Sequence, residues 1–259
     1  MSRYEQTFAE LKDQGRIAFI PFWMIGDPTP DTSLAVIDEL AQKADILELG
    51  LPFSDPLADG PTIQAAVNRS LEAGTNTEKC FEIIGSIREK YPKKPIGLLV
   101  YLNLVMQYGI DRFFETCANV GVDSVLIPEL PVEEVSLVKT AAQTHQIELV
   151  FLLSTNTPQA RRDRIYDHSG GFIYTVSTPS ITGAKTELSE DTLNLVSALK
   201  SDTKLPLCVG FGISTPEHIQ KLKAARADGA IIGSELINCY QKDGLESVID
   251  FCETCQKHT

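Results

Sequence analysis

Short apolar runs alternate with amphipathic stretches along the whole of this 259-residue chain. A run that is apolar throughout predicts a strand buried on both faces, and such strands are typical of parallel sheets. Consecutive parallel strands need a long crossover connection, which is usually a helix. Strands are predicted at Ile17–Trp23, Ile46–Leu51, Ile96–Tyr101, Ser124–Ile127, Glu148–Leu153, Phe172–Val176, Leu207–Phe211 and Gly229–Ile232.

Helical periodicity fills the segments between these runs. In Ser33–Gln42, for example, Leu34, Ile37 and Leu40 fall on one face of a helix. The other helices are predicted at Tyr4–Lys12, Ile63–Ala73, Glu78–Lys90, Asp111–Asn119, Val132–Thr144, Ala160–His168, Leu193–Lys200, Glu217–Arg226 and Leu245–Gln256.

Eight strand–helix units in about 250 residues fit a closed (β/α)₈ barrel better than an open doubly wound sheet. The open sheet predicts a G-x-G-x-x-G turn after the first strand, whereas the sequence has Gly26-Asp27-Pro28 there. No linker or low-complexity stretch divides the chain. We therefore predict an α/β protein: a single TIM-barrel catalytic domain over residues 1–259, with a short extra N-terminal helix and a short phosphate-binding helix after the eighth strand.

Charge and hydropathy patterns argue against several classes of partner. The formal net charge is −12, so the chain repels the phosphate backbone of nucleic acids. No stretch reaches the ~18 apolar residues of a membrane span, and no signal-peptide pattern opens the chain. The six cysteines are irregularly spaced, and Cys252-x-x-Cys255 has no further ligands to complete a metal site. We expect a cytoplasmic protein without a bound metal, a membrane or a nucleic acid partner.

Two carboxylates are candidates for acid–base chemistry. Glu48 interrupts the apolar strand Ile46–Leu51, where burial would raise its pKa towards neutrality. A structural glutamate satisfied by a neighbouring polar group fits the sequence equally well. Asp55 and Asp59 follow in the loop, where aspartates are more often turn or cap residues. Asp59 together with Glu48 could nevertheless form a pair of carboxylates in unlike environments.

Glycine-rich turns follow the last strands of the predicted barrel. They read Ser180-Ile-Thr-Gly-Ala184, Gly210-Phe-Gly-Ile-Ser214 and Gly233-Ser-Glu-Leu236, and the last opens a helix. Glycines let backbone N–H groups approach an anion, and a helix N-terminus adds its dipole. Phosphate sites of such barrels are built from these last loops, so the turns predict a phosphorylated ligand. Each glycine alone is equally compatible with a tight turn or a cap.

The run from Leu47 to Gln64, LELGLPFSDPLADGPTIQ, closely resembles the signature of the tryptophan synthase α subunit family. The resemblance covers essentially the whole chain. Further matches are Pro21-Phe22, Gly26-Asp27-Pro28, Gly97-Leu-Leu with Asn103-Leu-Val, Gly121-Val-Asp-Ser-Val-Leu and Gly210-Phe-Gly-Ile-Ser214.

This resemblance implies retro-aldol cleavage of indole-3-glycerol phosphate to indole and D-glyceraldehyde 3-phosphate. It implies that Glu48 protonates C3 of the indole ring and helps deprotonate the glycerol hydroxyl, and that Asp59 accepts a hydrogen bond from the indole N–H. Thr182 matches the threonine that orients this aspartate. The substrate-binding residues implied are Phe22, Leu99, Ile127 and Phe211 for the indole ring, Tyr174 near Glu48, and Gly183, Phe211, Gly212, Gly233 and Ser234 for the phosphate.

The resemblance also implies an α₂β₂ complex. Its β subunit carries pyridoxal phosphate and receives indole through a tunnel, so this chain needs no cofactor of its own. Asp55 and Pro56 match the loop that contacts β. Met24 replaces a usual threonine, Glu129 a usual aspartate, and Thr178-Pro179 an arginine with a small residue. The last change stiffens a loop and motivates an alternative, a weakly catalytic or non-catalytic activator of β.

Overall fold

The computed structural model of the chain describes residues 1–176, 188, 190–210 and 212–259. The described strands are parallel wherever they pair, and they form one sheet. They are β1 (Ala18–Met24), β2 (Leu47–Gly50), β3 (Ile96–Leu99), β4 (Ser124–Leu126), β5 (Glu148–Val150), β6 (Leu152–Ser154), β7 (Ile173–Val176), β8 (Leu207–Gly210) and β9 (Gly229–Ile232).

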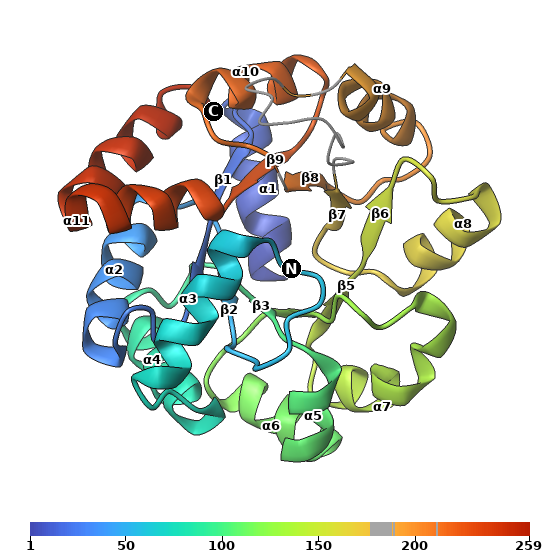
Figure 1. Cartoon of the computed structure of the whole chain (residues 1–259). Coiled ribbons are helices and arrows are strands. Elements are labelled where there is room, and N and C mark those ends of the chain that lie inside the picture. Colours follow the sequence, from blue (N-terminus) through green and yellow to red (C-terminus); the bar gives the residue numbers. More distant parts are fainter. Residues whose placement is uncertain (177–187, 189, 211) are drawn as a thin grey trace.

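The sheet closes on itself at Phe151. Its order is β5-β4-β3-β2-β1-β9-β8-β7-β6, and β5 and β6 are separated only by this residue. Glu148 of β5 pairs with β4, whereas Leu152 of β6 pairs with Tyr174 of β7. The strand predicted over Glu148–Leu153 is therefore divided into β5, which pairs with β4, and β6, which pairs with β7. The (β/α)₈ barrel predicted from the sequence is confirmed (Figure 1).

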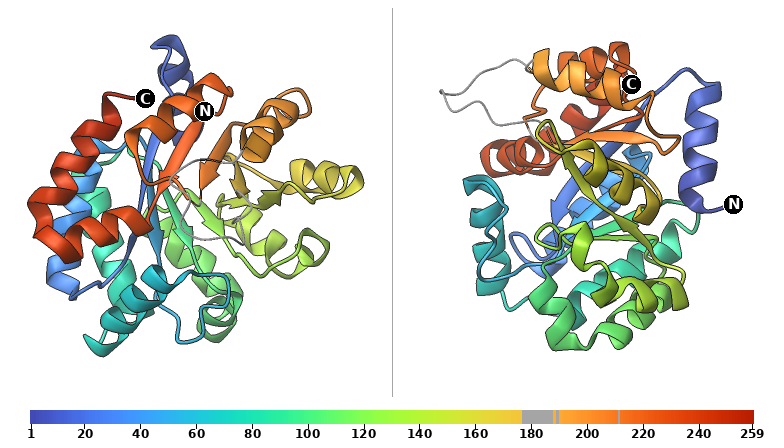
Figure 2. Two further views of the ribbon diagram at one scale, coloured as in Figure 1. Left: turned by 45° about the horizontal axis from the view of Figure 1, so that its top comes forward. Right: turned by 90° about the vertical axis from the view of Figure 1, so that its right-hand side faces the viewer.

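Helices surround this ring (Figures 1 and 2). The sequence did not predict α5, and it predicted α11 as two helices. Gly244 has a non-helical φ of 77° inside α11, which marks the boundary between those two. The described helices are α1 (Arg3–Asp13), α2 (Pro30–Lys43), α3 (Pro61–Glu72), α4 (Thr77–Lys90), α5 (Leu102–Tyr108), α6 (Ile110–Asn119), η1 (Val132–Glu134), α7 (Ser136–Thr144), α8 (Gln159–His168), α9 (Glu190–Leu199), α10 (Pro216–Ala224) and α11 (Ser234–Gln256).

Helix α1 covers the amino ends of the strands (Figure 2, right). Tyr4 is 1% exposed, and its hydroxyl lies 2.8 Å from that of Ser124, the first residue of β4. Its ring meets Phe172 edge-on just before β7. Because α1 covers this end, the loops at the carboxyl ends are left to form a site. No helix in the described part of the chain is long and apolar enough to span a membrane.

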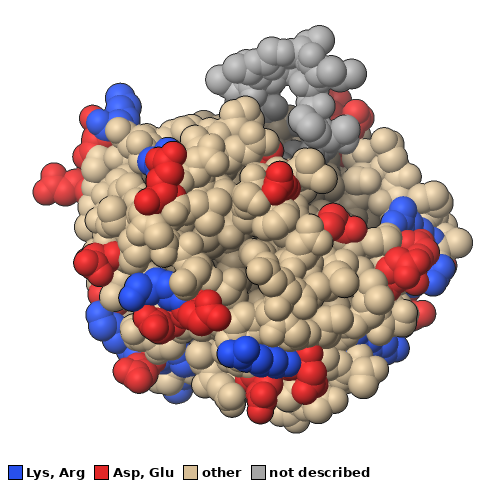
Figure 3. Space-filling model, turned by 60° about the horizontal axis from the view of Figure 1, so that its bottom comes forward, with Lys and Arg blue, Asp and Glu red and all other residues tan. Residues whose placement is uncertain are grey.

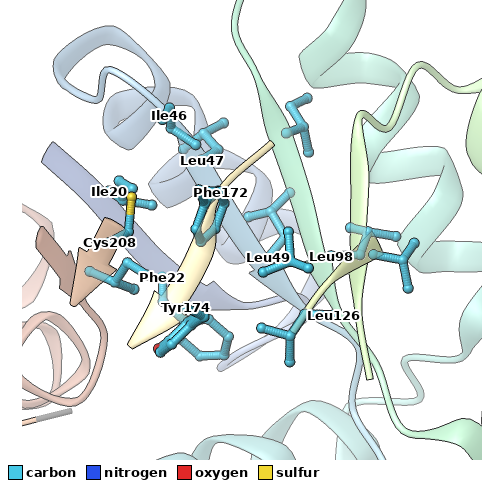
Figure 4. Close-up of a cluster of buried hydrophobic side chains, with 14 of the residues drawn as sticks. Ile20, Phe22, Ile46, Leu47, Leu49, Leu98, Leu126, Phe172, Tyr174 and Cys208 are labelled. Carbon is cyan, nitrogen blue, oxygen red and sulfur yellow. The ribbon is translucent and has the colours of Figure 1, made fainter. Parts of the chain in front are cut away.

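The inside of the ring is filled with apolar side chains, including Ile20, Leu126 and Phe172 (Figure 4). Every residue of β1 and of β2 is buried, because side chains cover one face of these strands and helices cover the other. Glu48 is the one charged residue within β2, so the fold withdraws its carboxyl group from water.

A buried ion pair fixes the turn after β1. Asp27 is 0% exposed, and Arg69 of α3 donates to both of its oxygens, from Nε at 2.6 Å and from Nη2 at 2.8 Å. Trp23 Nε1 donates to the Asp27 carbonyl, and Ser33 Oγ accepts from the N–H of Gly26. These bonds tie the carboxyl end of β1 to α3, the helix that follows the Asp59 loop.

We expect Arg69→Met to lower the free energy of unfolding by about 3 kcal/mol, because it leaves Asp27 buried without its partner. Urea unfolding of both proteins measures the change. As a control, Lys79→Met removes an exposed pair with Glu82 and should change stability by less than about 0.5 kcal/mol. Equal, small effects of the two substitutions would contradict this account.

Candidate active site

Glu48 lies in the middle of β2 and points into the barrel. In the strand register it stands between Phe22 of β1 and Gly97 of β3, and it is 3% exposed. Gly50 faces the same side of the strand, where an added Cβ would lie 2.6 Å from the Phe22 ring. The Glu48 carboxyl group therefore approaches the barrel interior from a rigid strand.

Burial controls the protonation of Glu48. No hydrogen bond from the described residues reaches its Oε2 atom. Burial raises the pKa of Glu48 to about 8, because the ionised form loses its hydration. At neutral pH the carboxyl group is mostly protonated, yet its ionised form stays accessible. Such a group can both give and take a proton.

Asp59 is the second carboxylate, and it comes from the loop between β2 and α3. It is half-buried, and its Oδ2 accepts a hydrogen bond of 3.0 Å from the Tyr101 hydroxyl. Burial raises the pKa of Asp59, and the bond from Tyr101 acts in the opposite direction. The two carboxyl groups thus have unlike surroundings: a phenol donates to Asp59, whereas no donor among the described residues reaches Oε2 of Glu48.

Tyr174 of β7 lies within the electrostatic reach of both carboxyl groups. Burial raises the pKa of its hydroxyl above the ordinary value, and the charges of Glu48 and Asp59 add to this. An added Cβ at Gly210 of β8 would lie 2.2 Å from the Tyr174 hydroxyl, so this strand position requires glycine. Tyr174 is therefore close enough to both carboxyl groups for their charges to act on its hydroxyl group.

A cavity of about 190 Å³ opens beside these groups at the carboxyl ends of the strands. Its walls are apolar on one side, where the rings of Phe22 and Tyr174 and the side chain of Leu99 lie. Glu48 is not among the lining residues and lies on β2 beneath them. The residues from the sequence analysis that line the cavity are Phe22, Asp59, Leu99, Tyr174, Gly212, Gly233 and Ser234.

The other side of the cavity is built from glycine turns and a helix N-terminus. Gly212 has a φ of 74°, and Gly233 caps α11, which begins at Ser234. An added Cβ at Gly233 would lie 2.9 Å from the Phe22 ring, so the backbone packs closely here. The described lining residues include no lysine or arginine. Backbone N–H groups, the hydroxyl groups of Ser214 and Ser234, and the α11 dipole are therefore what this wall offers an anion.

The structure does not bring every expected residue to this cavity. Ile127 lines a separate cavity of about 350 Å³ with Leu152 and Val176. Its neighbour Leu126 belongs to the cluster inside the barrel, because adjacent strand residues face opposite sides (Figure 4). Asp55 is exposed and Pro56 is partly buried, both in the Asp59 loop. Thr182, Gly183 and Phe211, and also Thr178 and Pro179, lie outside the described residues.

Tyr101 is a site residue that the sequence analysis does not identify, because it predicts Tyr101 as the last residue of the third strand. That strand ends at Leu99, and Tyr101 instead caps α5 with its side chain 3% exposed. Its place at the carboxyl end of a barrel strand was the available signal.

In the described part of the chain, no group of three potential ligands could hold a metal ion.

The closed parallel ring, its covered amino end and the cavity at its carboxyl ends define a (β/α)₈-barrel enzyme. The family model described as tryptophan synthase alpha chain matches residues 8–258. The chain therefore belongs to the tryptophan synthase alpha chain family, whose members are lyases that cleave indole-3-glycerol phosphate.

Relatives and solved structures agree with this assignment. The chain is 45% identical to the tryptophan synthase alpha chain of Enterobacter sp. (strain 638), covering 94% of this chain and 91% of that one. It is 44% identical to the one from Photobacterium profundum over the same shares. The alpha subunit structure from Legionella pneumophila has a TM-score of 0.91 at 32% identity, covering 100% of this chain and 98% of that one. A tryptophan synthase complex from Pyrococcus furiosus has a TM-score of 0.85 at 31% identity, covering 93% of this chain and 98% of that one.

We expect the buried Glu48 to make wild-type stability fall as pH rises. Its folded pKa of about 8 lies above the ordinary 4.5, so between these values the folded state holds a proton that the unfolded state releases. Glu48→Gln stays neutral, so its stability relative to wild type should rise from about pH 5 to 8 and then level off. The total rise is on the order of a few kcal/mol, at about 1.4 kcal/mol per pKa unit.

Urea unfolding at pH 5, 7 and 9 measures this difference. A difference between wild type and Glu48→Gln that stays constant across these pH values would show that Glu48 is ionised throughout.

Proposed function

We propose that residues 1–259 act as a single catalytic domain that cleaves indole-3-glycerol phosphate and passes indole to a β subunit for tryptophan synthesis. The observation that carries this proposal is the buried carboxyl group of Glu48, with a pKa of about 8, beneath a cavity that Asp59 lines. Asp59 and Glu48 take the catalytic roles.

The protons balance with these two groups alone. The neutral Glu48 carboxyl group protonates C3 of the indole ring, which leaves positive charge at the ring nitrogen. The Asp59 carboxylate accepts a hydrogen bond from the ring N–H and stabilises that charge. The Glu48 carboxylate then takes the proton of the adjacent glycerol hydroxyl as the C–C bond breaks. The bonding electrons return to the ring, indole and an aldehyde leave, and Glu48 is protonated again.

The cavity walls suit the two ends of this substrate. Phe22, Leu99 and Tyr174 offer apolar surface to the indole ring. Gly212, with Gly233 and Ser234 at the start of α11, offers N–H groups to the phosphate. We assign Thr182, Gly183 and Phe211 the roles that the family resemblance implies for them. Ile127 lines a different cavity, and Leu126, inside the barrel, is the better candidate for contact with the ring.

The face around the Asp59 loop and α5 suits a protein partner. Figure 3 brings forward the side where these elements lie in Figure 1, and the middle of this face carries few charged side chains. Leu57, beside Asp55 and Pro56, is 92% exposed, and Met106 of α5 is 56% exposed. One of the similar structures is described as an a2b2 complex from Pyrococcus furiosus. We assign this face to the β subunit, which alone would carry pyridoxal phosphate.

The six cysteines are free, which fits a reducing compartment such as the cytoplasm. The alternative, a chain that only activates β, is not favoured, because Glu48 and Asp59 supply both groups that the cleavage requires.

We expect Glu48→Gln to lower kcat for indole release by at least about 10²-fold, as is usual when a general acid–base group is lost. Asp59→Asn should have an effect of similar size, because the amide carries no charge to stabilise the ring nitrogen. Indole release from indole-3-glycerol phosphate by the purified proteins measures both. Asp55→Asn serves as the control and should keep kcat for the isolated chain. Full activity of Glu48→Gln would refute the assigned role.

We expect Met106→Glu to weaken binding to the β subunit by about tenfold or more, since burying a methionine side chain contributes about 1.5–3 kcal/mol. Titration of β, with stimulation of indole release as the signal, measures the affinity. Ala198→Glu adds the same charge at an exposed position of α9 and should leave the affinity unchanged. Equal affinities for all three proteins would place the interface elsewhere.

A further inference from the structure

Tyr101 joins the Asp59 loop to the barrel. Its hydroxyl donates to Asp59 Oδ2 at 3.0 Å and accepts from the backbone N–H of Ala58 at 3.0 Å. Its ring also lies 5.2 Å from that of Phe53, at the beginning of the same loop. One buried side chain therefore contacts the loop at both ends, and it is bonded directly to the carboxylate that lines the cavity.

Glu129 in turn holds the backbone beside Tyr101. It follows β4, and its Oε1 accepts a hydrogen bond of 2.5 Å from the N–H of Leu102. Leu102 is the first residue of α5, where an N–H group has no partner within the helix and favours a negative charge. Because Leu102 directly follows Tyr101, this hydrogen bond fixes the backbone position from which the tyrosine side chain extends.

We propose that Tyr101, held in place by Glu129, is a positioning residue that orients Asp59 towards the substrate and keeps it ionised. This inference rests on the proposed function and deepens it. Tyr101 occupies Oδ2, and no donor from the described residues reaches Oδ1. Among the groups that the structure describes, Oδ1 is therefore the Asp59 oxygen left to accept the ring N–H.

The phenol also sets the charge of Asp59. Burial raises the pKa of this carboxyl group, whereas the proton donated by Tyr101 stabilises the ionised form. An ionised carboxylate only accepts hydrogen bonds, which is what a ring N–H requires. Without Tyr101, Asp59 would take up a proton at a higher pH and lose the negative charge that stabilises the ring nitrogen.

The other titratable groups near Asp59 stay in place when the phenol is removed. Among the described residues, these include Glu48 on β2, Tyr174 on β7, Glu235, which lines the cavity from α11, and Glu129, whose charge acts on Tyr101. A change in the titration of Asp59 between wild type and Tyr101→Phe therefore reports the loss of one hydroxyl group.

The first test is the pH profile of indole release by Tyr101→Phe. We expect kcat to fall by about 10- to 100-fold, the usual effect of losing a hydrogen bond to a charged group. We also expect the acid limb of kcat/KM to move to higher pH, because activity is lost as Asp59 is protonated. Tyr108→Phe removes a hydroxyl group at the other end of α5 and should leave the rate and the profile unchanged.

The second test does not depend on turnover. The carboxyl ¹³C signal of Asp59, assigned with Asp59→Asn, should titrate at higher pH in Tyr101→Phe than in wild type. Glu129→Ala should shift this titration in the same direction, and Glu129→Gln, which keeps an acceptor oxygen, should restore it. An unchanged Asp59 titration or an unchanged acid limb in Tyr101→Phe would overturn the proposal. If wild type releases no indole, the proposed function fails, and the NMR titration still decides whether Tyr101 controls Asp59.

Discussion

The closure of the parallel ring at Phe151 determines the properties of the site. Because β5 and β6 follow one another directly in the chain, the two ends of the described sheet meet, and its strands are covered on both faces. A carboxyl group on the inner face of such a strand has no water to stabilise its charge. The raised pKa of Glu48 is thus a consequence of the fold, and not of a particular neighbour. With α1 packed over the amino end, access to the barrel interior is from the carboxyl ends.

The two carboxyl groups acquire different properties because they belong to different kinds of structure. Glu48 is on a strand whose position is set by ladders on both sides, and desolvation alone raises its pKa. Asp59 is in a loop, which by itself would not fix a side chain. The bond from Tyr101 supplies both the missing constraint and the opposing effect on the pKa. One chain thereby obtains a proton donor and an anionic acceptor from two similar residues.

The sequence predicted the barrel and the strands because local apolar patterns are strong in a doubly covered sheet. It could not predict the break at Phe151, since the run from Glu148 to Leu153 is apolar after its first residue and the break depends on the register of its neighbours. Helix α5 was missed because it has only seven residues and its first N–H is bonded to Glu129, which lies 27 positions away. The choice of Ile127 over Leu126 reflects a two-residue period, in which an error of one position exchanges the two faces.

The cavity wall proposed to bind the phosphate and the proposed acid–base group, Glu48, affect each other through charge. A lysine or arginine in the cavity would bind an anion strongly, but a cation near Glu48 would favour its ionised form and lower its pKa. The described lining residues contain neither, so Gly212, Gly233 and Ser234 offer an anion only the partial charges of N–H and hydroxyl groups. The field of a helix terminus is modest and falls off within about one turn. Binding the phosphate without a cation is therefore compatible with a glutamic acid that remains protonated at neutral pH.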